Sequence, residues 1–169
     1  MKKKTSPASP PVSPAATAVK PVHVSTILVP TDFSEPSFKA LQYAGKMAEE
    51  FNAQVILLYV NEPIAYPDFA AFPLAMEDDK VAKAATERLR TIGEKYIGKS
   101  RVERVVVRHG APFHEITEAA RTLKADLLII ATHGYTGLKH ALLGSTAERV
   151  VRHAPCPVLT VRDLERDII

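Results

Sequence analysis

The stretch from Asp126 to Val151 reads DLLIIATHGYTGLKHALLGSTAERVV and places three signals in order along the chain. The apolar run 126–130 is typical of a buried strand, and STAERVV is typical of the start of a helix. The loop between them carries three of the chain's seven glycines. Backbone N–H groups at a helix N-terminus have no partner within the helix, and glycine lets the backbone close on an anion. This order predicts a phosphate-binding loop.

Segments typical of strands alternate with segments typical of helices on both sides of this stretch. Helical spacing predicts a first helix that is capped by Ser34, has Glu35 and Pro36 in its first turn and reaches Phe51. The other predicted helices are 77–97, 111–124 and one that opens near Ser145; the predicted strands are 24–30, 53–60, 102–108, 126–130 and 158–161. Strands separated by helices require right-handed crossovers and a parallel sheet. The sequence therefore predicts an α/β fold, a doubly wound five-stranded parallel sheet with helices on both faces.

The chain divides into a tail and one domain. Its 169 residues, 46% of them hydrophobic, suit a single core. Residues 1–23 hold four lysines, no acidic residue and five of the thirteen prolines, a composition that predicts a disordered tail before a domain over 24–169. Removing the four lysine charges from the net charge of +3 leaves −1 for the domain, so its charge gives little support to nucleic-acid binding.

The sequence contains little that would direct the chain to a membrane or out of the cell. No long apolar run follows the lysines of the tail, which predicts neither a secretory signal nor a membrane anchor. Cys156 is the only cysteine, so an internal disulfide is excluded, and its place at the start of an apolar strand predicts a small buried side chain. These features fit a cytoplasmic protein.

Several separated motifs resemble one family. They are ILVPTDFS at 27–34, VILLYV at 55–60, GAP at 110–112 and APCPVLTV at 154–161. Nucleotide-binding members of the universal stress protein family also carry Gly, two residues, Gly, nine residues, Gly, then Ser or Thr. Here Gly134 and Gly144-Ser145 fit that spacing, while Ala131 replaces the first glycine. Residues 24–162 therefore resemble a universal stress protein.

The resemblance implies a Rossmann-like sheet with strand order 3-2-1-4-5 and an adenine nucleotide, ATP, as ligand. In such a sheet the ligand lies beyond the carboxyl ends of the strands, where the winding reverses. The implied site residues are Pro30, Thr31 and Asp32 on the nucleoside side, Tyr59 or Val60 against adenine, and Ala131, His133, Gly134, Gly144, Ser145 and Thr146 in the glycine loop. The resemblance allows Mg²⁺ with the nucleotide but implies no dedicated protein metal site.

Most of these residues have a structural alternative to ligand binding. An acid such as Asp32 also favours a helix N-terminus. Ser145 and Glu148 have the Ser-x-x-Glu spacing of a capping box, which accounts for both without a ligand. Gly134 and Gly144 suit turns that need positive φ, a role compatible with phosphate contact.

The sequence carries no clear catalytic motif. His133 is interpreted as a polar loop residue, since no acid is placed nearby to orient it as a base. The other histidines of the domain form no recognisable metal-ligand pattern: His109, His114, His140 and His153. The chain also lacks a Gly-Lys-Ser/Thr phosphate loop and a Gly-x-Ser-x-Gly elbow. We therefore expect no dedicated catalysis and at most slow ATP hydrolysis. The connection 61–76 is interpreted as a variable loop.

Two functions from different classes follow. The first is an ATP-binding stress-response or signalling protein whose nucleotide changes its association with partners. The second is a dimeric interaction module that binds no nucleotide, which Ala131 keeps open: a methyl group either crowds the ligand or, at negative φ, does no harm. In both, the resemblance implies a homodimer through the last strand, Pro157 to Val161. The charge of the domain and the lack of a long apolar run predict no nucleic-acid or membrane partner. An adenylate-transferring enzyme ranks last, because its signatures are missing.

Overall fold

The computed structural model describes residues 22–62, 75–132 and 143–162. The predictions for the tail, for most of the 61–76 connection and for His133 and Gly134 lie outside these residues.

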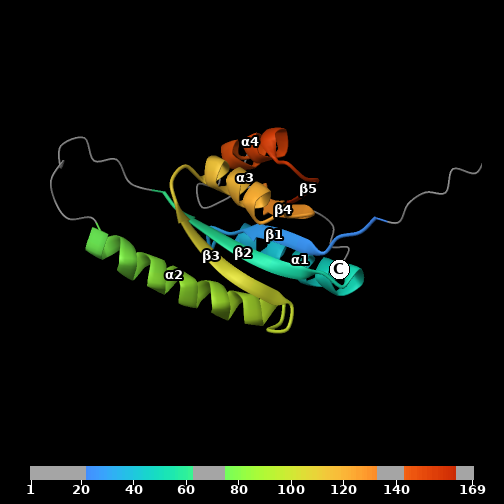
Figure 1. The fold of residues 1–169 in the computed structure, drawn as a ribbon, viewed down its shortest axis with the longest axis horizontal. Helices are drawn as coiled ribbons and strands as arrows, with labels where there is room; N and C mark the ends of the chain where they lie inside the picture. The colour runs from blue at the N-terminus through green and yellow to red at the C-terminus, as the bar shows by residue number, and fades with distance from the viewer. Residues whose placement is uncertain (1–21, 63–74, 133–142, 163–169) are drawn as a thin grey trace, which may run out of the picture.

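The described residues form five strands and four helices in strict alternation (Figure 1). The strands are β1 (Thr26–Pro30), β2 (Gln54–Asn61), β3 (Val102–His109), β4 (Leu127–Ala131) and β5 (Val158–Val161). The helices are α1 (Glu35–Phe51), α2 (Ala75–Tyr96), α3 (Pro112–Thr122) and α4 (Ser145–His153). All neighbouring strands are parallel, in the order β3-β2-β1-β4-β5. The predicted fold class and strand order are confirmed.

The sheet is covered on both faces, which explains its nearly continuous apolar strands. Side chains alternate across the sheet, so Ile27 and Val29 pack on the side of α1 and α2, while Leu28 packs on the side of α3 and α4. In β2, Leu57 belongs to the first cluster and Ile56 to the second. Each face thus has its own buried cluster, and the site lies at the strand ends between them.

The start of β1 differs from the prediction by two residues. The carboxylate of Asp126 accepts hydrogen bonds from the backbone N–H groups of Ser25 (2.8 Å) and Thr26 (2.9 Å). Val24 is buried but precedes the strand, and Asp126 itself precedes β4. The predicted strands 24–30 and 126–130 therefore begin too early, by two residues and by one. The reason is that the Asp126 carboxylate, and not a neighbouring strand, binds the backbone N–H groups at the start of β1.

Among the described residues, no helix is both long and apolar enough to cross a bilayer.

Candidate functional site

A cavity of about 530 Å³ opens at the carboxyl ends of β1, β2 and β4, beside the N-termini of α3 and α4. It lies where β1 and β4 are neighbours and the chain winds away in opposite directions. This is the position at which doubly wound sheets bind ligands, and the volume falls within the range of about 300–1,000 Å³ that is common for small-molecule sites.

Eight of the ten predicted site residues line this cavity. They are Pro30, Thr31, Asp32, Val60, Ala131, Gly144, Ser145 and Thr146. Tyr59, the alternative to Val60, lines it as well. His133 and Gly134 lie outside the described residues. The structure brings these groups together, and their contact with a ligand stays a prediction.

The turn after β1 is held by buried hydroxyl groups. Thr31 Oγ1 accepts a hydrogen bond from the N–H of Phe33 (3.0 Å) and shares one with Ser37 Oγ (2.8 Å). The N–H of Thr31 bonds to the carbonyl of Leu58 (2.9 Å), which ties the turn to β2. The cavity edge at β1 is therefore organised by the protein itself.

Asp32 lies exposed at this edge of the cavity. Its Oδ1 accepts hydrogen bonds from the N–H (3.0 Å) and the Oγ (2.5 Å) of Ser34. Ser34 is the residue that precedes α1, as predicted, but its side chain makes no capping bond to the helix. The predicted capping bond is therefore absent, and the Ser34 hydroxyl donates to the Asp32 carboxylate instead. Asp32 thus has a structural role in the turn together with its place at the cavity.

The loop between β4 and α4 is closed at its base. The N–H of Gly144 donates to the carbonyl of Thr132 (2.7 Å), and the N–H of Thr132 donates to Val161 (2.9 Å). Thr132 is 1% exposed. The two ends of the loop are therefore fixed against each other and against β5.

The first turn of α4 faces the cavity, and its capping differs from the prediction. The residue before the helix is Gly144, and the first intrahelical bond runs from Glu148 N–H to the Gly144 carbonyl (2.9 Å). Ser145 lies inside the helix, and Glu148 accepts from Arg152 (2.7 Å). The predicted Ser145–Glu148 capping box is wrong, because the helix begins one residue too early for it. The N–H groups of Ser145, Thr146 and Ala147 are those that an α-helix leaves without an acceptor of its own.

Backbone geometry answers two questions that the glycine pattern leaves open. Gly144 has φ −68° and ψ 153°, so the interpretation that it serves a positive-φ turn is wrong. Ala131 is the last residue of β4, pairs with Val161 and packs in the cluster on the α1 side. Extended backbone accepts any L-residue, so Ala131 causes no backbone strain where the family signature has glycine.

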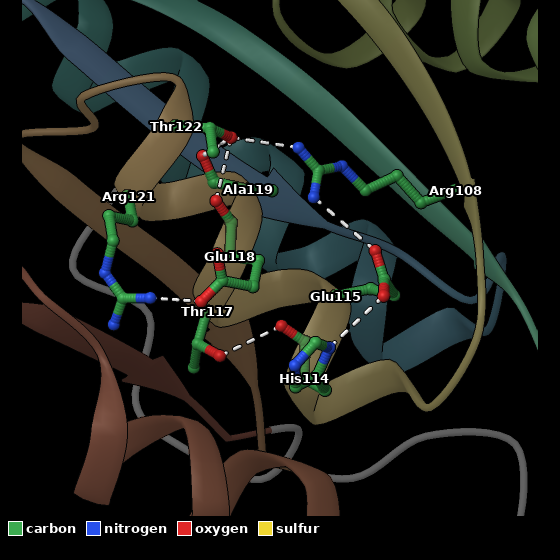
Figure 2. A network of polar contacts seen from close by, with 8 residues as sticks. All are labelled: Arg108, His114, Glu115, Thr117, Glu118, Ala119, Arg121 and Thr122. Atoms are coloured by element: carbon green, nitrogen blue, oxygen red, sulfur yellow. Dashed lines mark hydrogen bonds and ion pairs between the residues drawn. The ribbon is translucent and has the colours of Figure 1, made fainter.

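The α3 side of the cavity is held by a half-buried ion pair (Figure 2). Arg108 reaches from β3 to α3, where its guanidinium contacts Glu115 Oε2 (3.4 Å) and donates to Thr122 Oγ1 (2.9 Å). The side chain of Arg108 is 25% exposed, and that of Glu115 is 21% exposed. Pro112 and Ile116, from the first turns of α3, line the cavity. The pair thus links β3 to the helix whose first turns form one wall of the cavity.

Sequence reasoning missed several residues of the cavity wall. Those with polar side chains are Ser37, Asn61, Glu62 and Thr132. Asn61, Glu62 and Thr132 directly end or follow β2 and β4, and that position is the signal that could have found them. Ser37 had no such signal, since it lies inside a helix.

The part of the chain that the structure describes contains no group of three or more His, Cys, Asp or Glu side chains that could hold a metal ion.

The fold and the cavity together define the class: a doubly wound α/β protein with a ligand-sized cavity at the reversal of its winding. The model of the Universal stress protein family matches residues 23–162. The chain belongs to this family.

Individual relatives agree with this placement. Universal stress protein MJ0531 of Methanocaldococcus jannaschii is 36% identical over an alignment of 145 residues, and the match covers 83% of this chain and 84% of the relative. The solved structure of universal stress protein UspA from Lactobacillus plantarum has a TM-score of 0.73 and 28% identity, and the match covers 83% of this chain and 99% of that one. A universal stress protein solved in complex with cAMP has a TM-score of 0.53 and 27% identity, over 83% and 98% of the two chains.

Proposed function

We propose that this protein binds an adenine nucleotide, ATP, in the cavity and uses it to control association with partners in a stress response or signalling. The observation that carries the proposal is the convergence of the α4 N-terminus and the Asp32 turn on one cavity. The complex of a related universal stress protein with cAMP supports the ligand class.

The phosphates belong at the first turn of α4. The N–H groups of Ser145, Thr146 and Ala147 offer donors, and the helix dipole adds a favourable field for an anion. The hydroxyls of Ser145 and Thr146 line the same cavity and supply further donors. A Mg²⁺ ion that accompanies ATP would be held by phosphates and water, since Mg²⁺ keeps several waters in most nucleotide sites.

The nucleoside belongs at the other end of the cavity. Asp32 offers a carboxylate to the ribose or base, and Tyr59 and Val60 at the end of β2 offer apolar surface. The charges divide the cavity accordingly, since an anionic phosphate is repelled by Asp32 and attracted to the start of α4.

The proposed assembly is a homodimer through β5. Within the described ranges 22–62, 75–132 and 143–162, this strand pairs with β4 alone, and its other edge is the open edge of the sheet. Partner proteins would then respond to the loop between β4 and α4, whose base is fixed beside the proposed phosphate site.

A substitution of Gly144 tests the phosphate end of the site. Gly144→Val keeps a backbone that valine adopts without strain, at φ −68° and ψ 153°, and places two methyl groups at the cavity. We expect ATP binding, measured by calorimetry, to be lost while the far-UV spectrum stays native. Ala154→Val is the matched control, because Ala154 ends the same helix with a similar backbone, φ −61° and ψ 141°. Unchanged ATP affinity in Gly144→Val would remove the start of α4 from the site.

A substitution of Asp32 tests the nucleoside end. Asp32→Ala should weaken ATP and AMP by the same factor, since both ligands carry the same nucleoside. A loss confined to ATP would contradict the orientation proposed here. Absence of any adenine nucleotide binding by the unaltered protein, at millimolar ligand, would overturn the function itself.

A further inference from the structure

Phe33 adopts a backbone conformation that is rare for its residue type. Its φ is +63°, in the left-handed region that glycine and asparagine visit far more readily than a bulky residue. The strain persists because the surroundings hold it: the N–H of Phe33 donates to Thr31 Oγ1 (3.0 Å), and Asp32 binds Ser34 on the other side. Strain of this kind concentrates at functional sites, where the surrounding structure offsets its cost.

The ring of Phe33 contacts side chains from two other elements. The ring of Tyr59, at the end of β2, lies 4.8 Å from it between centroids, at an interplanar angle of 33°. The guanidinium carbon of Arg88, on α2, lies 4.2 Å from the Phe33 centroid. Tyr59 lines the cavity, whereas neither Phe33 nor Arg88 is among the described residues that line it. Contacts through these three side chains therefore connect α2 to the cavity wall.

We infer that Phe33 and Arg88 are positioning residues for the nucleotide site, acting through Asp32 and Tyr59. Arg88 and Tyr59 hold the Phe33 ring, and the held ring keeps the 31–34 turn in the strained form that presents the Asp32 carboxylate at the cavity. Tyr59 is fixed by the same contact. The inference rests on the proposed function and extends it to a helix that does not line the site.

The geometry of the turn alone does not account for a phenylalanine at position 33. Phe33 is half-buried and contacts the cluster on the α1 side, so its ring contributes to packing. A residue that served only the turn would be glycine or asparagine, which adopt positive φ at lower cost. The aromatic ring is needed if its contacts with Arg88 and Tyr59 set the turn.

Two arginines of α2 provide a matched pair for the test. Arg88→Gln removes the cation above the Phe33 ring, while Arg90→Gln removes an equal charge that pairs with Glu87 (2.9 Å) at the surface. By calorimetry with ATP and with AMP, Arg88→Gln should raise both Kd values about two- to fivefold, the range expected for an exposed cation–π contact. Arg90→Gln should leave both Kd values unchanged, and Arg88→Lys should restore most of the affinity.

Substitutions of Phe33 separate positioning from packing. Phe33→Leu should raise both Kd values about three- to tenfold, because the aromatic pair is lost, while Phe33→Tyr should retain affinity. Phe33→Gly relaxes the turn backbone but removes the ring, so it should lose affinity to at least the extent of Phe33→Leu.

The outcomes distinguish this inference from the proposed function. If the unaltered protein binds ATP and AMP but Arg88→Gln, Phe33→Leu and Phe33→Gly bind them equally well, the positioning role is overturned and the function stands. A fall in melting temperature without a change in Kd would likewise leave Phe33 a packing residue and overturn the inference. If the unaltered protein binds neither nucleotide, the function fails and the inference fails with it.

Discussion

Gly110 and Gly98 both have positive φ, but their surroundings differ. Gly110 (φ +141°) follows β3, and a Cβ atom there would lie 3.1 Å from Glu115 Oε1 and 3.2 Å from its Cγ. Gly98 (φ +96°) follows α2, and a Cβ atom would meet nothing within 4 Å. Substitution of Gly98 therefore introduces backbone strain without crowding, and substitution of Gly110 introduces both.

We expect Gly98→Ala to lower the free energy of unfolding by about 1 kcal/mol through strain alone, and Gly110→Ala by about 2–3 kcal/mol through strain and crowding. Urea denaturation of both variants measures the difference. Repeating Gly110→Ala in a Glu115→Ala background should shrink its cost toward that of Gly98→Ala, as a double-mutant cycle. Equal costs for the two glycine variants would contradict the role given to Glu115.

Cys156 packs against the cluster on the α3 side as a small side chain, but it is half-buried and not buried as predicted. Burial, and to a smaller extent the charge of Asp126, raises the pKa of the Cys156 thiol above its ordinary value of 9.0. The folded protein therefore holds the thiol proton at a pH where the unfolded chain releases it.

This shift predicts a loss of stability at alkaline pH. Where the native state binds more protons than the unfolded state, stability falls as pH rises. The contribution of Cys156 is fully present below pH 9.0 and is lost as pH rises through the higher pKa of the folded state. Unfolding free energies measured from neutral pH upward should fall more steeply for the unaltered protein than for Cys156→Ala. Parallel curves for the two proteins would refute the shift.

Among the secondary-structure elements, β3 and α3 are linked by the contacts of Arg108 with Glu115 and Thr122. Its ion pair with Glu115 is mostly shielded from water, whereas the Arg90–Glu87 pair on α2 is 61% and 63% exposed. Exposed pairs add little to stability, and loss of one partner of a shielded pair leaves the other poorly solvated.

Arg108→Met keeps the apolar stem and removes the charge, and we expect it to lower the free energy of unfolding by about 1–2 kcal/mol. Arg90→Met should change it by no more than about 0.5 kcal/mol. Chemical denaturation of both variants at the same salt concentration measures these changes in the free energy of unfolding. A cost for Arg108→Met as small as that for Arg90→Met would show that the pair in Figure 2 does not anchor α3.

Across the complete fold, β5 is the edge through which the proposed dimer would form. The carbonyls of Pro157 and Val161 accept hydrogen bonds from the N–H groups of Leu128 in β4 and of Thr132 directly after it. Odd-numbered residues of β5 therefore direct their backbone groups toward β4. In a parallel ladder the alternate residues, Val158 and Thr160, then direct their backbone groups toward the open edge.

Thr160→Pro should therefore abolish the dimer and preserve the fold. Proline removes an N–H that β4 does not use, and it is tolerated on an edge strand. Sedimentation of the unaltered protein should show a dimer and that of Thr160→Pro a monomer, with native far-UV spectra for both. A Thr160→Val variant, which keeps the N–H, serves as the control. A monomeric unaltered protein, or a dimeric Thr160→Pro variant, would exclude pairing through β5.

The amino-acid sequence by itself determined the layout of this protein. Strands that are apolar on both faces and helices with one apolar face are local patterns, and their alternation sufficed for the α/β class. The family resemblance supplied the strand order. Together they placed the cavity at the ends of β1, β2 and β4, because that position follows from topology. Predicted ends were less accurate where a distant group intervenes, as Asp126 does at β1.

Only the tertiary structure decided which groups meet around the cavity. Ser145 is inside α4 and is not its cap. Thr132 and Gly144 close the base of the loop between β4 and α4, and Arg88 reaches from α2 to Phe33 in the turn after β1. Hydrophobic periodicity indicates whether a segment is a helix or a strand and which of its faces is buried. These contacts join segments far apart in sequence, so they depend on how the helices pack on the sheet, and no local pattern carries that information.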